Sequence, residues 1–406
     1  MIALKQVIPF LKHLLSYIIF VYIIFYFKIN AQTQETRTMI FDGNEREYII
    51  YIPSSYDGST EFPLIFNFHG GNGISSDFMN YTNDMRPLAN SHDFIAVYPQ
   101  AAVDPVDGSY AWLHKAPTSH DDIFFIEAII DNLNNEFSID NDRVYACGYS
   151  EGGIFSYELA CRLNNRIAAI SSVSGSMLVD SFRDSYYDLG FCSPIHPTSV
   201  LLMLGTADSN PHSTYNGFSP YYMSAEEITS YWSNYNNTEN NPIINQLPNT
   251  NTTDGSSVEQ RIWENGDNCS KVEELKIIGG GHDWPGVFGN MDINASSYIW
   301  DFVSQFNING LIGCESLSTN QQNNTNLKYL VYPNPSSDFI IIKIEGLNNQ
   351  DLEIELIDIK GKLIEKKIIS KGQTIDYFNF KSANSGIYFV RFLGNRVRKT
   401  KKIIVK

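Results

Sequence analysis

The segment Gly148-Tyr149-Ser150-Glu151-Gly152 stands between an apolar run and a helical pattern, and it constrains the fold more than any other stretch. The apolar residues 144–147 predict a buried strand, and the periodicity of 154–163 predicts a helix. A strand that turns directly into a helix needs small residues on both sides of the turn, which the two glycines provide. We therefore expect a sharp strand–turn–helix junction with Ser150 at its tip.

Gly-x-Ser-x-Gly in this context is typical of the nucleophile elbow of serine hydrolases. Such a turn exposes the Ser150 hydroxyl above the sheet edge and directs the first N–H groups of the following helix toward an oxyanion formed there. The alternative interpretation is an ordinary glycine-rich turn with a capping serine.

A serine hydroxyl needs an adjacent base, and the chain order of this fold class is serine, acid, histidine. His282 follows a strand-like run, 272–278, inside the glycine-dense segment 279–286. Asp208 closes the continuous apolar strand 200–204, at the edge where the sites of open α/β sheets lie. Other residues remain alternatives: Asp180, Asp184, Asp188 and Asp254 for the acid, and His212 for the base.

A second oxyanion donor is expected in the turn after an earlier strand. The run 63–68 predicts that strand, and His69-Gly70-Gly71 follows it. The expected donors are the N–H of Gly70 or Gly71 and the N–H of Glu151. His69 precedes the turn, and we expect it to be structural.

The central part of the chain alternates strand and helix patterns, which predicts an α/β fold with a mostly parallel sheet and helices on both faces. About 280 residues suffice for one large core. Two polar stretches, 176–197 and 236–258, are expected to form an irregular rim. The expected strands are 48–52, 64–68, 94–98, 143–148, 168–173, 200–205 and 275–278, and the expected helices are 123–137, 154–163, 225–235 and 298–306.

These motifs together resemble the polyhydroxybutyrate depolymerase and feruloyl esterase family of α/β hydrolases, which is similar to carbohydrate esterase family 1. The resemblance spans about residues 38–307 and is most specific around His282. It implies a triad of Ser150, Asp208 and His282, with Trp284 near the substrate. Aromatic residues are expected to offer the substrate a stacking surface, with burial in the core as the alternative: Trp112, Tyr215, Tyr221, Tyr222 and Trp284. The segment 209–213 is longer than its usual form in the family. No metal or cofactor is expected.

Both ends of the chain differ from this domain, which we place at 32–308. Residues 1–31 read as a secretory signal peptide, since two lysines precede an apolar run, 14–27, that is short for a membrane span. An uncleaved anchor is the alternative. Residues 309–328 are rich in Asn, Gln, Ser and Thr, which predicts a polar linker.

The last part of the chain, 329–406, contains short strand-like runs separated by turns, which predicts a small β-sandwich. Its Tyr332-Pro333-Asn334-Pro335 start, the segment 386–390 and its basic end resemble the C-terminal sorting domain of type IX secretion. The resemblance implies that the type IX machinery is a partner and that the protein is secreted or held at the outer cell surface. A carbohydrate-binding or adhesion sandwich is the alternative.

The formal net charge is −16, although residues 351–406 contain 13 Lys and Arg against 6 Asp and Glu. The preceding part is therefore strongly acidic, which argues against nucleic-acid binding and favours neutral polysaccharide or polyester substrates. Among five cysteines, Cys161 and Cys192 form the preferred disulfide, because one follows the elbow helix and the other precedes the strand leading to Asp208. Connectivity is not fixed by sequence. Cys147 is expected to be a free core thiol.

Three functions remain open from the sequence. The first is a secreted serine esterase that acts on plant cell-wall polysaccharide, like a feruloyl or acetyl xylan esterase. The second is a depolymerase of polyhydroxybutyrate or short polyhydroxyalkanoates. The third is a secreted binding protein that keeps the hydrolase fold without its chemistry.

Overall fold

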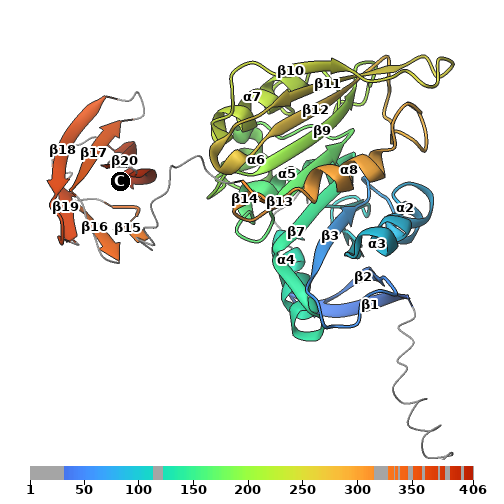
Figure 1. The fold of residues 1–406 in the computed structure, drawn as a ribbon, viewed down its shortest axis with the longest axis horizontal. Helices are drawn as coiled ribbons and strands as arrows, with labels where there is room; N and C mark the ends of the chain where they lie inside the picture. Colours follow the sequence, from blue (N-terminus) through green and yellow to red (C-terminus); the bar gives the residue numbers. More distant parts are fainter. Residues whose placement is uncertain are drawn as a thin grey trace, which may run out of the picture. The chain divides into compact units, whose positions relative to one another are not determined.

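In the computed structural model the chain divides into two compact units, residues 1–316 and residues 317–406 (Figure 1). The expected signal peptide and most of the expected linker lie outside the residues that the structure describes. Those residues are 32–112, 122–314, 328–332, 334–336, 339–345, 351–358, 362–373, 375–379, 385–394 and 397–405.

A ten-stranded sheet forms the centre of the first unit (Figure 1). Its middle strands are parallel, in the order β4-β3-β7-β8-β9-β12, and antiparallel strands extend it at both edges: β2 and β1 beyond β4, β11 and β10 beyond β12. The strands are β1 (Thr33–Phe41), β2 (Asn44–Ile52), β3 (Phe62–Phe68), β4 (Ile95–Pro99), β7 (Ile139–Tyr149), β8 (Ala169–Val173), β9 (Ser199–Gly205), β10 (Ile243–Gln246), β11 (Ser257–Trp263) and β12 (Val272–Ile278).

Each face of this sheet has its own apolar core. Along β3, Leu64, Phe66 and Phe68 enter one cluster and Ile65 enters the other, as the two-residue period of a strand requires. The first cluster includes side chains of α4 (Asp122–Glu136), α5 (Glu151–Arg162) and α7 (Ala225–Asn236). The second includes side chains of α2 (Ser75–Tyr81), α3 (Arg86–His92) and α8 (Ala295–Val303).

The predicted rim contains more regular structure than its polarity suggested. Residues 180–187 form the short helix α6 (Asp180–Tyr187), and the segment 236–258 contributes β10 and the start of β11. The polar composition misled the prediction because all four residues of β10 are exposed at the edge of the sheet.

The first unit also extends beyond residue 308, where we expected the linker to begin. A two-stranded sheet, β13 (Phe306–Asn307) and β14 (Gly310–Leu311), follows α8, and the N–H of Ile308 donates to the carbonyl of Asp142. A disulfide joins Cys269 to Cys314. These contacts hold the chain against the first unit up to residue 314.

Two antiparallel sheets make up the second unit, one of three strands and one of four. Side chains of both sheets share one apolar cluster, which includes Ile342 of one sheet and Leu356 and Val390 of the other. This is the arrangement of a small sandwich. The strands are β15 (Lys328–Tyr332), β16 (Phe339–Glu345) and β19 (Ile375–Asn379), and β17 (Leu352–Asp358), β18 (Leu363–Ile369), β20 (Gly386–Gly394) and β21 (Val397–Val405).

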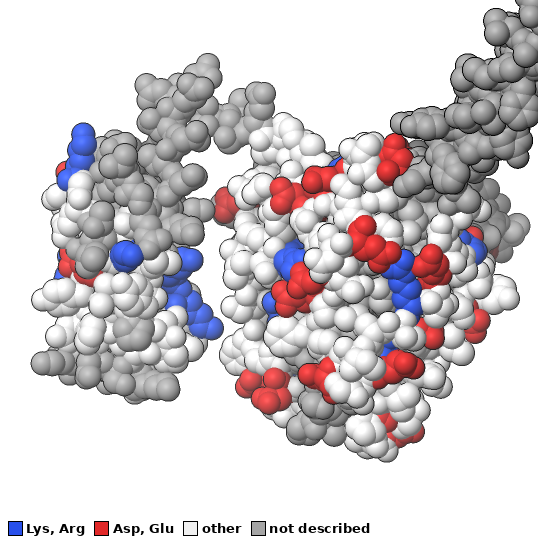
Figure 2. Space-filling view, turned by 90° about the horizontal axis from the view of Figure 1, so that it is seen from below, with Lys and Arg blue, Asp and Glu red and all other residues white. Residues whose placement is uncertain are grey.

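Figure 2 shows one side of the molecule, where Asp and Glu side chains are spread over the first unit with fewer Lys and Arg among them. In the described part of the chain, no helix has both the length and the apolar character needed to cross a membrane.

Candidate active site

Ser150 lies at a strained junction between β7 and α5. Its backbone has φ 55° and ψ −119°, a conformation that a residue other than glycine adopts only when the surroundings impose it. The N–H of Ser150 donates to the carbonyl of Val173 on β8, and the Ser150 carbonyl accepts the N–H groups of Gly153 and Ile154. The surrounding hydrogen bonds therefore hold the predicted sharp turn.

The two glycines of the motif are required by close backbone approach. A Cβ atom at Gly148 would lie 2.2 Å from the backbone of Gly152. A Cβ atom at Gly152 would lie 2.3 Å from the carbonyl oxygen of Phe68, the last residue of β3. The helix thus starts directly against the end of the neighbouring strand, and no larger residue fits at either position.

The loops after β9 and β12 carry the predicted acid and base. These strands are parallel neighbours, with Gly205 opposite Ile277, so their carboxyl ends lie side by side. A Cβ atom at Gly205 would lie 2.3 Å from the carbonyl oxygen of Gly281, which shows how closely the two loops approach. Sheet order therefore brings Asp208 to His282 although 74 residues separate them.

Asp208 and His282 form a hydrogen-bonded pair. The distance from His282 Nδ1 to Asp208 Oδ2 is 2.8 Å, and the side chains are 26% and 1% exposed, respectively. Burial alone would raise the pKa of Asp208, but hydrogen bonds from His282 and Ser213 outweigh burial and lower the pKa below its ordinary value. The pair thus has a buried, ionised carboxylate behind an imidazole that solvent can reach.

Tyr149, the residue before Ser150, contacts His282. The Tyr149 ring packs 5.0 Å from the His282 ring, between centroids, and the Tyr149 hydroxyl donates to the His282 carbonyl over 2.8 Å. Ser150 and His282 make no hydrogen bond to each other among the described residues. Catalytic hydrogen bonds often form only when substrate is bound, so a proton transfer from Ser150 to His282 is compatible with the structure.

The turn after β3 contacts Ser150 from the other side. A Cβ atom at Gly70 would lie 3.3 Å from Ser150 Cβ, and one at Gly71 would lie 2.8 Å from Glu151 Oε2. The pairing of Phe68 with Gly148 in the parallel sheet puts these two strand ends next to each other. The expected oxyanion residues Gly70, Gly71 and Glu151 are therefore neighbours in the structure.

His69 fixes this turn from within the core. The N–H of Ala101 donates to His69 Nε2, which therefore carries no proton, so Nδ1–H donates to the Gly70 carbonyl over 2.7 Å. Burial lowers the pKa of His69 to about 4 and keeps the ring neutral. The Gly70 carbonyl and the Gly71 N–H belong to one planar trans peptide and point in opposite directions. His69, which binds the carbonyl, therefore also fixes the direction of the Gly71 N–H. His69 is thus structural.

The structure corrects the expectation that Trp112 and Trp284 contact substrate. Trp112 is 2% exposed, donates its Nε1–H to the His69 carbonyl and stacks on Phe155. Trp284 is fully buried and packs edge-on against Phe78. Both rings belong to the core that supports the loops of the site, because burial of their large apolar surface outweighs exposure at the rim.

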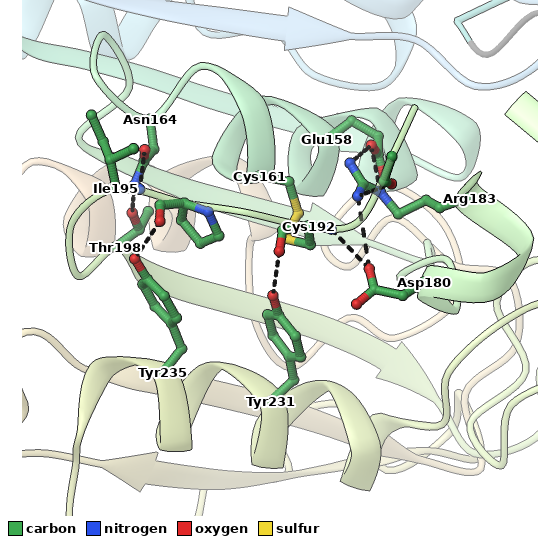
Figure 3. Close-up of a disulfide and its surroundings, with 12 residues drawn as sticks. Glu158, Cys161, Asn164, Asp180, Arg183, Cys192, Ile195, Thr198, Tyr231 and Tyr235 are labelled. Atoms are coloured by element: carbon green, nitrogen blue, oxygen red, sulfur yellow. Dashed lines mark hydrogen bonds and ion pairs between the residues drawn. A yellow bond between two sulfur atoms is a disulfide. The ribbon is translucent and has the colours of Figure 1, made fainter. Parts of the chain in front are cut away.

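Farther along α5, a disulfide and a buried ion pair attach α6 and the chain that follows it (Figure 3). Cys161 of α5 is bonded to Cys192, with the Cα atoms 4.7 Å apart. Arg183 of α6 donates to both carboxylate oxygens of Glu158, and neither side chain is exposed. The helix that begins after Ser150 is thereby anchored near its other end. Cys147 is free and buried.

Sequence reasoning did not single out two residues of this site, Ser213 and Tyr149. Ser213 is fully buried and lies 2.6 Å from Asp208 Oδ2 and 2.9 Å from His282 Nδ1, measured from Oγ. Its only signal in the sequence was its place in the unusually long segment after Asp208. The alternative acids and His212 are not the residues that the structure pairs with His282 and Asp208.

Comparison with known proteins agrees with this architecture. Residues 65–259 match the family described as alpha/beta hydrolase fold, and residues 330–406 match the secretion system C-terminal sorting domain. The predicted α/β hydrolase fold of the first unit and the sorting domain at the C-terminus are therefore confirmed.

Curated relatives are esterases. Feruloyl esterase B of Piromyces equi is 27% identical over 273 residues, which cover 65% of this chain and 46% of that protein. The bifunctional acetylxylan esterase/xylanase XynS20E of Neocallimastix patriciarum is 25% identical over 284 residues, which cover 70% and 36%. A probable feruloyl esterase C of Aspergillus terreus is 32% identical over 138 residues, which cover 33% and 48%. The chain spans less than half the length of these relatives.

Proposed function

We propose that the protein is a secreted serine esterase that hydrolyses carboxylic esters on plant cell-wall polysaccharide, of the feruloyl or acetyl xylan type. The observation that carries the proposal is the hydrogen-bonded Asp208–His282 pair, against which Tyr149 packs directly before Ser150 and its strained turn. Ser150 is the nucleophile, His282 is the general base, and Asp208 holds the imidazole in the required tautomer.

The reaction follows from this arrangement. His282 Nε2 takes the proton of the Ser150 hydroxyl as Oγ attacks the ester carbonyl. The N–H groups of Glu151 and of Gly70 or Gly71 donate to the resulting oxyanion. His282 then protonates the leaving alcohol, and an acyl group remains on Ser150. Water repeats the sequence with His282 as base, and the carboxylic acid leaves.

Two observations support the proposed substrate class: the names of the relatives and the acidic character of the first unit. Of the three relatives described above, two are named feruloyl esterases and one acetylxylan esterase/xylanase. The acidic first unit suits a neutral polymer better than a polyanion. A polyester is also a neutral polymer, so a depolymerase of 3-hydroxybutyrate chains is an outcome that the experiment below must separate.

We also propose that the protein acts outside the cell. The C-terminal sorting domain supports secretion. Cleavage of residues 1–31 and recognition of 329–406 by the type IX machinery would place the esterase outside the cell, free or on the outer surface, where plant polymers are accessible.

The test is hydrolysis of three esters by residues 32–406, with Ser150→Ala as the matched control. The esters are methyl ferulate, acetylated xylan and a 3-hydroxybutyrate oligomer. Turnover of ferulate or xylan that disappears in Ser150→Ala supports the proposal. Turnover of the oligomer alone assigns the protein to polyester degradation. No turnover that depends on Ser150, with all three esters, favours a binding protein.

A further inference from the structure

The segment after Asp208 folds back onto the carboxylate that it follows. The Asn210 N–H donates to Asp208 Oδ1 over 2.9 Å, and the Ser213 N–H donates to the Asn210 carbonyl over 3.0 Å. This turn brings the Ser213 hydroxyl to the other carboxylate oxygen, Oδ2, at 2.6 Å. Both oxygens of Asp208 are thus held by the loop that carries it, independently of His282.

Ser213 also reaches His282, which closes a three-membered cluster. An ionised carboxylate only accepts hydrogen bonds, so the Ser213 hydroxyl donates to Asp208. His282 Nδ1–H then has two acceptors within reach, Asp208 Oδ2 at 2.8 Å and Ser213 Oγ at 2.9 Å. Asp208 Oδ2, Ser213 Oγ and His282 Nδ1 are thus all within hydrogen-bond distance of one another. If one of these atoms moves, its distances to the other two atoms change.

We propose that Ser213 is a positioning residue, which holds Asp208 and His282 in the geometry required for proton transfer. The inference rests on the proposed roles of Asp208 and His282. Ser213 acts through Asp208 and His282 and is assigned no contact with the substrate. Its hydroxyl withdraws negative charge from Asp208 and gives the imidazole N–H a second acceptor.

Three other titratable groups lie in contact with the cluster or next to it in the chain. Tyr149 packs on the His282 ring from β7. Asp283 follows His282, and His212, which precedes Ser213, stacks its ring on Tyr222. Asp283 Oδ2 accepts the N–H groups of Gly281 and Asn290. The Ser213 hydroxyl, by contrast, lies within hydrogen-bond distance of Asp208 and His282 themselves, so the pH profile of the variant is compared with that of the wild type and of the control.

The experiment compares Ser213→Ala with the wild type in the full secreted chain, residues 32–406. Ser233→Ala is the matched control, because Ser233 is a buried serine whose hydroxyl, among the described residues, donates to the Thr229 carbonyl of its own helix α7. Ser213→Cys, with a similar volume and a weaker donor, is the second variant in case Ser213→Ala does not fold. The readouts are the pH profile of kcat/KM with 4-nitrophenyl acetate and the NMR resonance of the His282 Nδ1 proton.

We expect kcat of Ser213→Ala to fall about tenfold or more at unchanged KM, as loss of a hydrogen bond to a charged group predicts. Without the hydroxyl, Asp208 loses a hydrogen bond that lowers its pKa, and His282 Nδ1–H loses one of its two acceptors, so the pH profile of kcat/KM changes. The Nδ1 proton resonance moves as well, and Ser213→Cys lies between the two. Ser233→Ala matches the wild type in each readout.

The inference is overturned if Ser213→Ala, or Ser213→Cys when the alanine variant does not fold, keeps the wild-type Nδ1 proton resonance. An unchanged kcat and pH profile would contradict it equally. If the wild type shows no esterase activity that depends on Ser150, the proposed function fails, and the NMR comparison still decides the role of Ser213.

Discussion

At the scale of single residues, the positions of the three proposed catalytic residues could be predicted from the sequence, while the contacts that support them could not. Ser150, Asp208 and His282 each follow a strand that apolar runs reveal, so chain order and strand ends locate them. Ser213 has no such signal, because its position depends on a turn of the loop after Asp208. The tryptophans were misplaced because an aromatic residue has the same sequence signature in a core and at a rim.

Replacement of Asp208 by Asn tests the pair most directly at this scale. An amide can accept or donate toward Nδ1, so it no longer enforces the tautomer that leaves Nε2 free as a base. We expect kcat to fall by roughly 10³–10⁴-fold, as in comparable triads. Asp254→Asn is the matched control, since Asp254 bonds to Ser256 and Met291, and its kcat should equal that of the wild type. Equal loss in both variants would contradict the assignment of the acid.

The same carboxylate predicts a pH dependence of stability. The pKa of Asp208 is lower in the folded state than its ordinary value. Asp208 therefore stabilises the fold at pH values above the unfolded pKa, and this contribution is lost as pH falls through the folded pKa. Urea unfolding from about pH 6 to about pH 3 should show the free energy of the wild type approaching that of Asp208→Asn. If the difference in the free energy of unfolding between the wild type and Asp208→Asn stays constant with pH, the predicted contribution of Asp208 is wrong.

At the scale of elements, the parallel strands were predictable because each is a buried apolar run bounded by turns. The helices α2, α3 and α6 have only seven or eight residues, too few for a clear helical period. The edge strand β10 is exposed along its length, so no apolar pattern marks it. Long apolar elements were therefore found, whereas short helices, even those that bury side chains against the sheet such as α2 and α3, and exposed edge strands were missed.

The buried ion pair between α5 and α6 gives a prediction at this scale (Figure 3). Arg183→Met leaves the Glu158 carboxylate buried without its partner and should lower the free energy of unfolding by about 3–5 kcal/mol. Adding Glu158→Met removes the unpaired charge and should recover most of that loss. Urea denaturation of both variants is the measurement. A double variant less stable than Arg183→Met would show that the pair is not the cause.

At the scale of the whole molecule, each unit has a core of its own. Composition separated the two units, since the second is basic and rich in short strands. The end of the first unit was placed too early, because the Cys269–Cys314 disulfide brings together positions 45 residues apart that sequence alone could not pair.

Two truncations test this boundary. Residues 32–316 keep the Cys269–Cys314 disulfide and β14, whereas residues 32–308 lose both. The shorter protein should be less stable by about 2–4 kcal/mol, the usual effect of losing a disulfide, and the longer one should retain full ester hydrolysis. Thermal unfolding with and without reductant checks the difference. Equal stability of the two oxidised proteins would place the boundary at 308.

The central claim is that Ser150 is a nucleophile activated by the Asp208–His282 pair. The most direct measurement is mass spectrometry of the full chain after reaction with a fluorophosphonate, which forms a covalent bond with an activated serine. The account predicts one modification, on the peptide that contains Ser150, none in Ser150→Ala, and much slower modification in His282→Ala. Modification of another residue, or an unchanged rate in His282→Ala, would contradict the account.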